Sequence, residues 1–71
     1  SSQPAAKKIC AARRWLREAV KASPRLALAH HFLGMAEKRL GNRRKGKQHL
    51  RRYLALRPKG MLAEDTRRAL R

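Results

Sequence analysis

Apolar residues recur along this chain at the three- and four-residue spacing of an α-helix. The clearest segment covers residues 25–40, where one helical stripe is formed by Leu26, Ala29, Leu33, Ala36 and Leu40. The pair Gly41-Asn42 follows at once and suits the left-handed backbone that ends a helix. The pattern therefore predicts an amphipathic helix over 25–40 with one buried face.

Three other segments have the same periodicity. Helices are predicted over 4–22, where Pro4 suits the first helical position, and over 43–56, which ends before Pro58. Another is predicted over 61–70, whose acidic start and basic end suit the helix dipole. No segment alternates as a β-strand does. The turn after residue 40 is so short that the helices on either side should form an antiparallel hairpin. The sequence thus predicts an all-α fold of four helices in a single domain over 1–71.

The sequence also aligns with itself after a shift of 34 residues. The shift aligns small or apolar residues, basic residues and prolines with residues of the same type: Ala12 with Gly46, Leu16 with Leu50, Arg17 with Arg51, Val20 with Leu54, Pro24 with Pro58, Arg25 with Lys59, Leu28 with Leu62 and Ala29 with Ala63. A helix pair that repeats every 34 residues resembles the tetratricopeptide repeat (TPR) family.

Within residues 27–58 this resemblance can be followed residue by residue. The family's Leu-Gly pair, turn, small residue, large apolar residue and final proline are matched by Leu33-Gly34, Gly41, Gly46, Leu50 and Pro58. The departures are His30 for the usual Trp, Glu37 for the usual Tyr and Tyr53 for a small residue. The resemblance implies a solenoid of antiparallel helix hairpins: the second helix of one repeat, one full repeat, and a C-terminal capping helix.

Charge is the extreme feature of the composition. The chain has 20 Lys and Arg residues against 4 Asp and Glu, a formal net charge of +16. Such a charge attracts polyanions, and its self-repulsion destabilises the compact state. We expect an acidic protein or peptide as partner, with nucleic acid as the alternative. Attachment to an anionic membrane through the first helix is a weaker third, because the apolar face of that helix is needed to cover the hairpin.

The TPR resemblance divides the candidate binding residues between two surfaces. In this family the first helix of each repeat lines a concave groove and the second lies on the outer side. The groove would then contain Leu28, His31, Met35, Lys38 and Arg39. The outer face would carry two parallel rows, called here the basic ridge: Arg13, Arg14, Arg17 and Lys21, then Lys47, Arg51 and Arg52. His31 and Met35 stand where a carboxylate clamp of the family would want Lys and Asn, so that clamp is not expected.

A DNA-binding helix-turn-helix is the competing fold. Its recognition helix would be residues 43–56, which offer phosphate- or base-contacting side chains at Arg43, Arg44, Lys45, Lys47, Gln48, Arg51 and Arg52. The 34-residue shift and the apolar stripe of this helix favour stacked helices instead. Phe32 and Tyr53 are expected in the core, so a base-stacking platform is not predicted. Nucleic-acid binding would be mainly to the duplex backbone and would weaken steeply with salt.

Residues with catalytic or metal-binding potential are few and scattered. Residues 41–48 nearly spell a phosphate-binding loop, but a helix precedes them and Gln48 lacks the hydroxyl that would hold magnesium. His30 and His31 point about 100° apart with no further ligand in reach, so we expect His30 packed and His31 facing the groove. Four acidic residues leave little material for acid/base catalysis. The sequence predicts a non-enzymatic protein with no cofactor and no metal.

The remaining expectations concern context. The lone Cys10 fits a half-buried thiol in a reducing compartment, and no apolar run approaches the length of a membrane span, so a cytoplasmic location is expected. The polar lead 1–3 without an initiator Met suggests a fragment of a longer protein. The open edge of the first helix, near Cys10 and Trp15, is the expected place for self-association.

Overall fold

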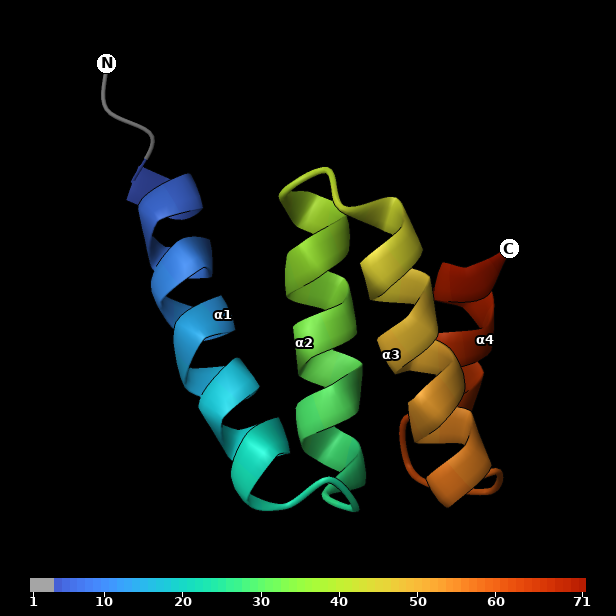
Figure 1. Cartoon of the computed structure of the whole chain (residues 1–71). Helices are drawn as coiled ribbons and strands as arrows, with labels where there is room; N and C mark the ends of the chain where they lie inside the picture. Colours follow the sequence, from blue (N-terminus) through green and yellow to red (C-terminus); the bar gives the residue numbers. More distant parts are fainter. Residues whose placement is uncertain (1–3) are drawn as a thin grey trace.

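The computed structural model describes residues 4–71, and they form four α-helices (Figure 1). The helices are α1 (Pro4–Ala22), α2 (Ala27–Arg39), α3 (Arg43–Leu56) and α4 (Ala63–Leu70). No strand is present in this range, so the all-α prediction is confirmed. Each helix runs antiparallel to the one before it, and α2 packs between α1 and α3 while α4 packs on α3 (Figure 1). The predicted lead 1–3 lies outside the described residues.

Two of the predicted helices are shorter than expected. α2 begins at Ala27 instead of Arg25, because Leu26 is extended and its N–H donates to the Ser23 carbonyl at 2.9 Å in a tight turn. α4 begins at Ala63 instead of Met61. Gly41, with φ of 91°, takes the left-handed conformation predicted for the end of the second helix. The bounds of α1 and α3 agree with the sequence prediction.

The centre of the fold is the contact between α2 and α3. A Cβ atom on Gly34 would lie 2.8 Å from the Gly46 carbonyl oxygen, and one on Gly46 would lie 2.8 Å from the Gly34 carbonyl oxygen. The two backbones therefore touch at this point, which only glycine allows at such a distance. Beside them Leu33 and Leu50 are completely buried. The small-residue position predicted at Gly46 is thus a backbone contact.

Tyr53 fixes α4 to this hairpin. Its ring is 2% exposed and packs in a cluster with Ala27 of α2 and Ala63 of α4. The Tyr53 hydroxyl accepts a hydrogen bond from the Leu62 backbone N–H at 3.0 Å, just before α4 begins. The large residue that departs from the family pattern therefore fills the space where three helices meet.

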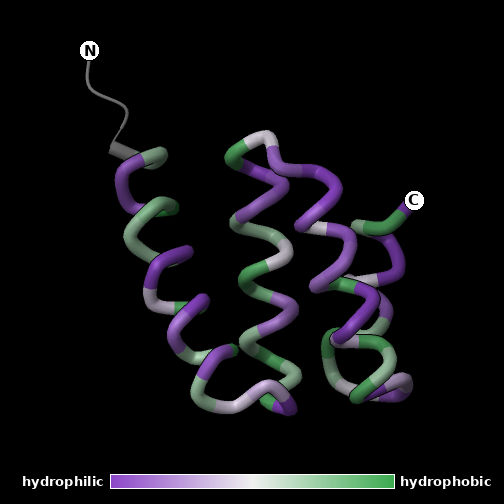
Figure 2. Tube along the Cα trace, in the orientation of Figure 1, coloured by the Kyte–Doolittle hydropathy of each residue, from purple (hydrophilic) through white to green (hydrophobic). Residues whose placement is uncertain are grey.

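Hydropathy divides the helices clearly. α3 is hydrophilic along most of its length and α1 alternates between hydrophilic and hydrophobic stretches, whereas α2 and the segment before α4 are more hydrophobic (Figure 2). α2 is the most buried helix, with eight buried residues. The basic residues of α1 and α3 consequently lie on either side of the same central helix.

Candidate functional site

One buried carboxylate joins α1 to the hairpin. The Glu37 side chain of α2 is 1% exposed and accepts hydrogen bonds from Arg13 Nη1 at 3.4 Å, Arg17 Nη2 at 3.2 Å and Asn42 Nδ2 at 2.8 Å. Burial alone would raise the pKa of Glu37, but the Asn42 hydrogen bond and the charges of Arg17 and Arg13 hold it below its ordinary value. Arg13 and Arg17 of the basic ridge therefore already form ion pairs within the molecule.

The corresponding pair on α3 has no such carboxylate. The 34-residue shift places Arg13 on Lys47 and Arg17 on Arg51, and it places Glu37 on Arg71. Lys47 is half-buried and Arg51 exposed, and no acidic side chain of the described residues forms an ion pair with either. In the basic ridge, therefore, Arg13 and Arg17 are neutralised by Glu37, whereas Lys47 and Arg51 have no carboxylate partner among the described residues.

The remaining acidic residues are also paired. On the exposed surface, Glu18 lies 3.8 Å from Lys21 of the ridge, while Glu64 and Asp65 lie 3.8 and 3.3 Å from Arg68. Exposed pairs of this kind contribute little to stability. They matter for the electrostatic field around the molecule instead. Every acidic side chain of the described residues is paired with a basic one, so none is left to neutralise the other basic side chains. The two remaining residues of the basic ridge, Arg14 and Arg52, are exposed and form no ion pair within residues 4–71.

The predicted groove residues separate into two groups. Leu28 and Met35 are 50% and 36% exposed, and Arg39 is exposed. The prediction of His31 as an open groove residue is wrong: it is buried against α4, and it contributes only to the lining of the hollow between α1 and α2 described below. His31 Nδ1–H donates to Thr66 Oγ1 at 2.8 Å, and burial lowers the pKa of His31 despite the opposing charge of Asp65. The Lys38 ammonium donates to the Ala69 carbonyl near the end of α4, so it too fastens α4.

Two accessible apolar residues of α2, Phe32 and Met35, face α1 across a hollow of about 370 Å³, called here the α1–α2 groove. It is lined by Ile9, Ala12 and Leu16 of α1 and by His31, Phe32, Met35, Ala36 and Arg39 of α2. Phe32 is 50% exposed, so the prediction that it lies in the core is wrong. The groove is apolar, with one guanidinium at its edge.

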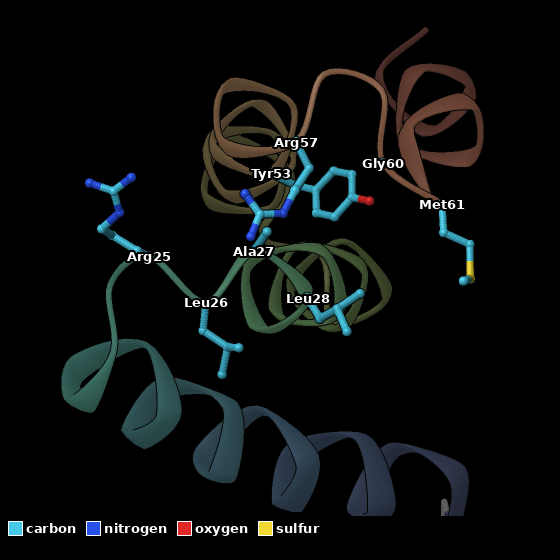
Figure 3. A pocket seen from close by; sticks show the side chains of 8 residues that line it. All are labelled: Arg25, Leu26, Ala27, Leu28, Tyr53, Arg57, Gly60 and Met61. Carbon is cyan, nitrogen blue, oxygen red and sulfur yellow. The ribbon is translucent and has the colours of Figure 1, made fainter.

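A second hollow, of about 390 Å³, lies where α2 begins and the α3–α4 connection passes (Figure 3). Its lining is mostly apolar: Arg25, Leu26, Ala27, Leu28, Tyr53, Arg57, Gly60 and Met61. The Arg57 guanidinium donates to the Leu56 carbonyl at 3.1 Å, and Arg25 points away from the other residues (Figure 3). This hollow offers apolar contact beside positive charge, and it contains no acidic group.

The histidine predicted to be packed is indeed buried, and it forms a pair with a residue of α3. His30 stacks on His49 with ring centroids 5.4 Å apart and Nδ1 atoms 3.1 Å apart. Because the Pro24 carbonyl can only accept, His30 Nε2–H donates to it at 2.7 Å, which leaves Nδ1 of neutral His30 to accept from His49 Nδ1–H. Burial lowers the pKa of His49, and the neighbouring His30 lowers it further; the charge of Glu37 opposes the shift, while those of Arg17 and Lys45 add to it. No group of three potential metal ligands exists among residues 4–71.

The edge of α1 opposite the hairpin is open. Cys10 is exposed, contrary to the predicted half-buried thiol, and Trp15 is 78% exposed. Across residues 4–71, every helix is too short or too polar to cross a bilayer. The sequence prediction missed the exposure of Phe32, whereas the exposed Trp15 lies near the edge of the first helix that was expected to be open.

The comparisons with known proteins are negative: no protein-family model, curated protein or solved structure matches this chain.

Proposed function

We propose that this chain is a non-enzymatic interaction module, built as a TPR-like stack of helix pairs, that docks an acidic protein or peptide. One observation carries the proposal. Two equivalent basic pairs lie 34 residues apart, and within residues 4–71 a carboxylate pairs with Arg13 and Arg17 but none pairs with Lys47 or Arg51. An acidic side chain of a partner is the simplest group to complete the second pair.

The Glu37 site supports this by example. There a carboxylate is held between two basic residues one helical turn apart, at 3.2 and 3.4 Å. Lys47 and Arg51 have the same one-turn spacing on α3, and Arg52 adds a third cation beside them. Charge-assisted hydrogen bonds are stronger than neutral ones, and a net charge of +16 speeds encounter with an acidic partner. The site therefore suits recognition of acidic side chains.

Nucleic acid is the second candidate, on a separate observation. The first turn of α3 exposes Arg43, Arg44 and Lys45, and Gln48 follows on the exposed surface. These side chains would contact a duplex backbone, and binding would depend steeply on salt. The antiparallel course of α2 and α3 in Figure 1 supports the scaffold over a helix-turn-helix, in which the two helices cross at a wide angle.

The two functions are separable by fluorescence anisotropy with a labelled acidic peptide and a labelled DNA duplex across a salt series. We expect the peptide to remain bound at physiological salt and duplex binding to disappear by moderate salt. The double variant Lys47→Glu/Arg51→Glu should weaken peptide binding at least tenfold, since two charge-assisted contacts are reversed.

The matched control is Lys7→Glu/Lys8→Glu on the exposed start of α1, which changes net charge equally. It should weaken binding only about two- to threefold through the general field. Equal losses of peptide affinity in the two double variants would show that Lys47 and Arg51 of α3 have no specific role in binding. Tight, salt-steep duplex binding without peptide binding would establish the nucleic-acid function instead.

A further inference from the structure

We infer that the α1–α2 groove is the docking site for one further α-helix, supplied by an acidic partner. The acidic character of the partner rests on the proposed function. The helical form of the partner and its place do not, because they follow from the internal repeat of the structure.

The groove has a counterpart within the molecule. The 34-residue shift moves Ala12 and Leu16 of α1 to Gly46 and Leu50 of α3, and it moves Phe32 and Met35 of α2 to Thr66 and Ala69 of α4. All four counterparts contact one helix, α2, which packs against both α3 and α4. The space that α2 occupies beside α3 and α4 is called here its cleft.

The contacts of α2 show how such a cleft is filled. Gly34 of α2 meets the backbone of Gly46 and the side chain of Leu50. His31 donates to Thr66, and Lys38 donates to the carbonyl of Ala69. Gly46 is consequently buried, and both Leu50 and Thr66 are 0% exposed.

The same positions one repeat earlier are bare. Ala12 is exposed where Gly46 is buried, and Phe32 is 50% exposed where Thr66 is 0% exposed. Met35 is 36% exposed, and its neighbours Ile9 and Leu16 are only half-buried. Apolar side chains gathered in one groove favour association with a complementary apolar surface. The shape of that surface is the one that α2 presents to α3 and α4.

Trp15 does not line the groove, but the same 34-residue comparison applies to it. Its counterpart is His49, which stacks on His30 of α2. Trp15 itself is 78% exposed. A helix seated in the α1–α2 groove as α2 is seated in its own cleft would therefore cover the Trp15 ring. This indole is the only one in the chain, so it reports on the groove directly.

The chemistry of the groove specifies the docking helix. A small residue is needed at its centre, as Gly34 is in α2, and apolar residues are needed one turn to either side to meet Leu16, Phe32 and Met35. Arg39 at the edge and the net charge of +16 favour acidic flanks. A second copy is disfavoured, because it carries the same +16 charge and its own α2 is already buried.

The test follows Trp15 emission while the full chain is titrated with three synthetic peptides of about 18 residues, long enough to form a helix. The first is an amphipathic helix with Ala at its centre, Leu one turn to either side and Glu elsewhere. The second replaces Glu by Gln, and the third scrambles the Leu positions. We expect the first to shift the emission to the blue at the lowest concentration and the third to cause no shift.

Ala12→Arg and Ala11→Arg form the matched pair of variants. Both residues are exposed on α1, but only Ala12 lines the groove. Ala12→Arg should weaken the first peptide at least tenfold, and Ala11→Arg should leave its affinity within about twofold. Far-UV circular dichroism of both variants checks that the helices are retained.

The outcomes separate the inference from the proposed function. Acidic-peptide binding that leaves Trp15 unchanged and tolerates Ala12→Arg, yet is lost in Lys47→Glu/Arg51→Glu, would overturn the groove and keep the acidic partner. Equal binding of the Gln peptide, still lost in Ala12→Arg, would keep the groove as a helix site and overturn the acidic partner. A concentration-dependent blue shift without peptide, with a dimer in sedimentation, would replace the partner by a second copy.

Discussion

The two neighbours of α2 hold it by different means. Against α3, the backbones of Gly34 and Gly46 touch and Leu50 is completely buried, so the fit depends on shape. Against α1, the specific contacts are the ion pairs of Glu37 with Arg13 and Arg17, while Leu16 stays half-buried. Buried apolar contact is insensitive to pH, whereas a paired carboxylate is not. The hairpin α2–α3 is therefore the tighter contact, and α1 is held by half-buried apolar side chains together with the Glu37 ion pairs.

The largest effect should come from truncating equivalent leucines on the two sides. Leu50→Ala removes a completely buried side chain and should lower the free energy of unfolding by about 3 kcal/mol. Leu16→Ala, its counterpart on α1, should cost only about 1 kcal/mol because the side chain is half exposed to begin with. Urea denaturation followed by circular dichroism measures both. Equal costs would mean that α1 is packed as tightly as α3.

The next effect concerns the Glu37 ion pairs. Glu37→Gln keeps the size of the side chain but removes its charge, and it should cost about 2 kcal/mol, since hydrogen bonds to charged groups contribute about 1.5–3 kcal/mol. The loss of stability should be confined to the attachment of α1. Amide hydrogen exchange should accelerate in α1 while the centre of the α2–α3 hairpin keeps its protection. Uniform acceleration in all helices would show that the carboxylate stabilises the fold as a whole.

The smallest effect is a pH dependence confined to a mildly acidic range. The pKa values of His49 and His31 are lowered by burial, so below the ordinary histidine pKa of about 6.5 the unfolded chain binds protons that the folded chain does not. Stability should be constant above that pH and fall as the pH decreases through the two folded pKa values. Urea midpoints at a series of pH values would reveal the decline.

The variant His49→Gln gives the control for this pH dependence. It removes one of the two titrating groups and should flatten the decline, and a decline of unchanged slope would assign the effect elsewhere. The contribution of Glu37 lies in a separate range. Its pKa is also lowered, so the stability that it provides is present above the ordinary glutamate pKa of about 4.3 and is lost only at more acidic pH.

Sequence reasoning succeeded where a residue's role depends on its near neighbours along the chain. The apolar spacing that predicted the helix around Leu33 also buries that residue, and Gly41 ends the helix in the left-handed conformation expected of it. Reasoning failed for His31 and Phe32, adjacent residues whose predicted exposures are reversed in the structure. Both depend on whether a helix from elsewhere in the chain lies over them, and α4 covers only His31.

The sequence by itself thus determined the four helices, the 34-residue repeat, the small residues at the helix contact and the excess of positive charge. These follow from local periodicity, from backbone sterics and from composition. The packing of the helices in three dimensions makes Glu37 neutralise Arg13 and Arg17, whereas within residues 4–71 no carboxylate pairs with Lys47 or Arg51; it also fills one groove with α2 and leaves its counterpart open. The physical reason is that ion pairing and burial require groups some 20 to 35 residues apart to meet, as Arg17 meets Glu37 and His31 meets Thr66, and no spacing along the chain specifies which of them will.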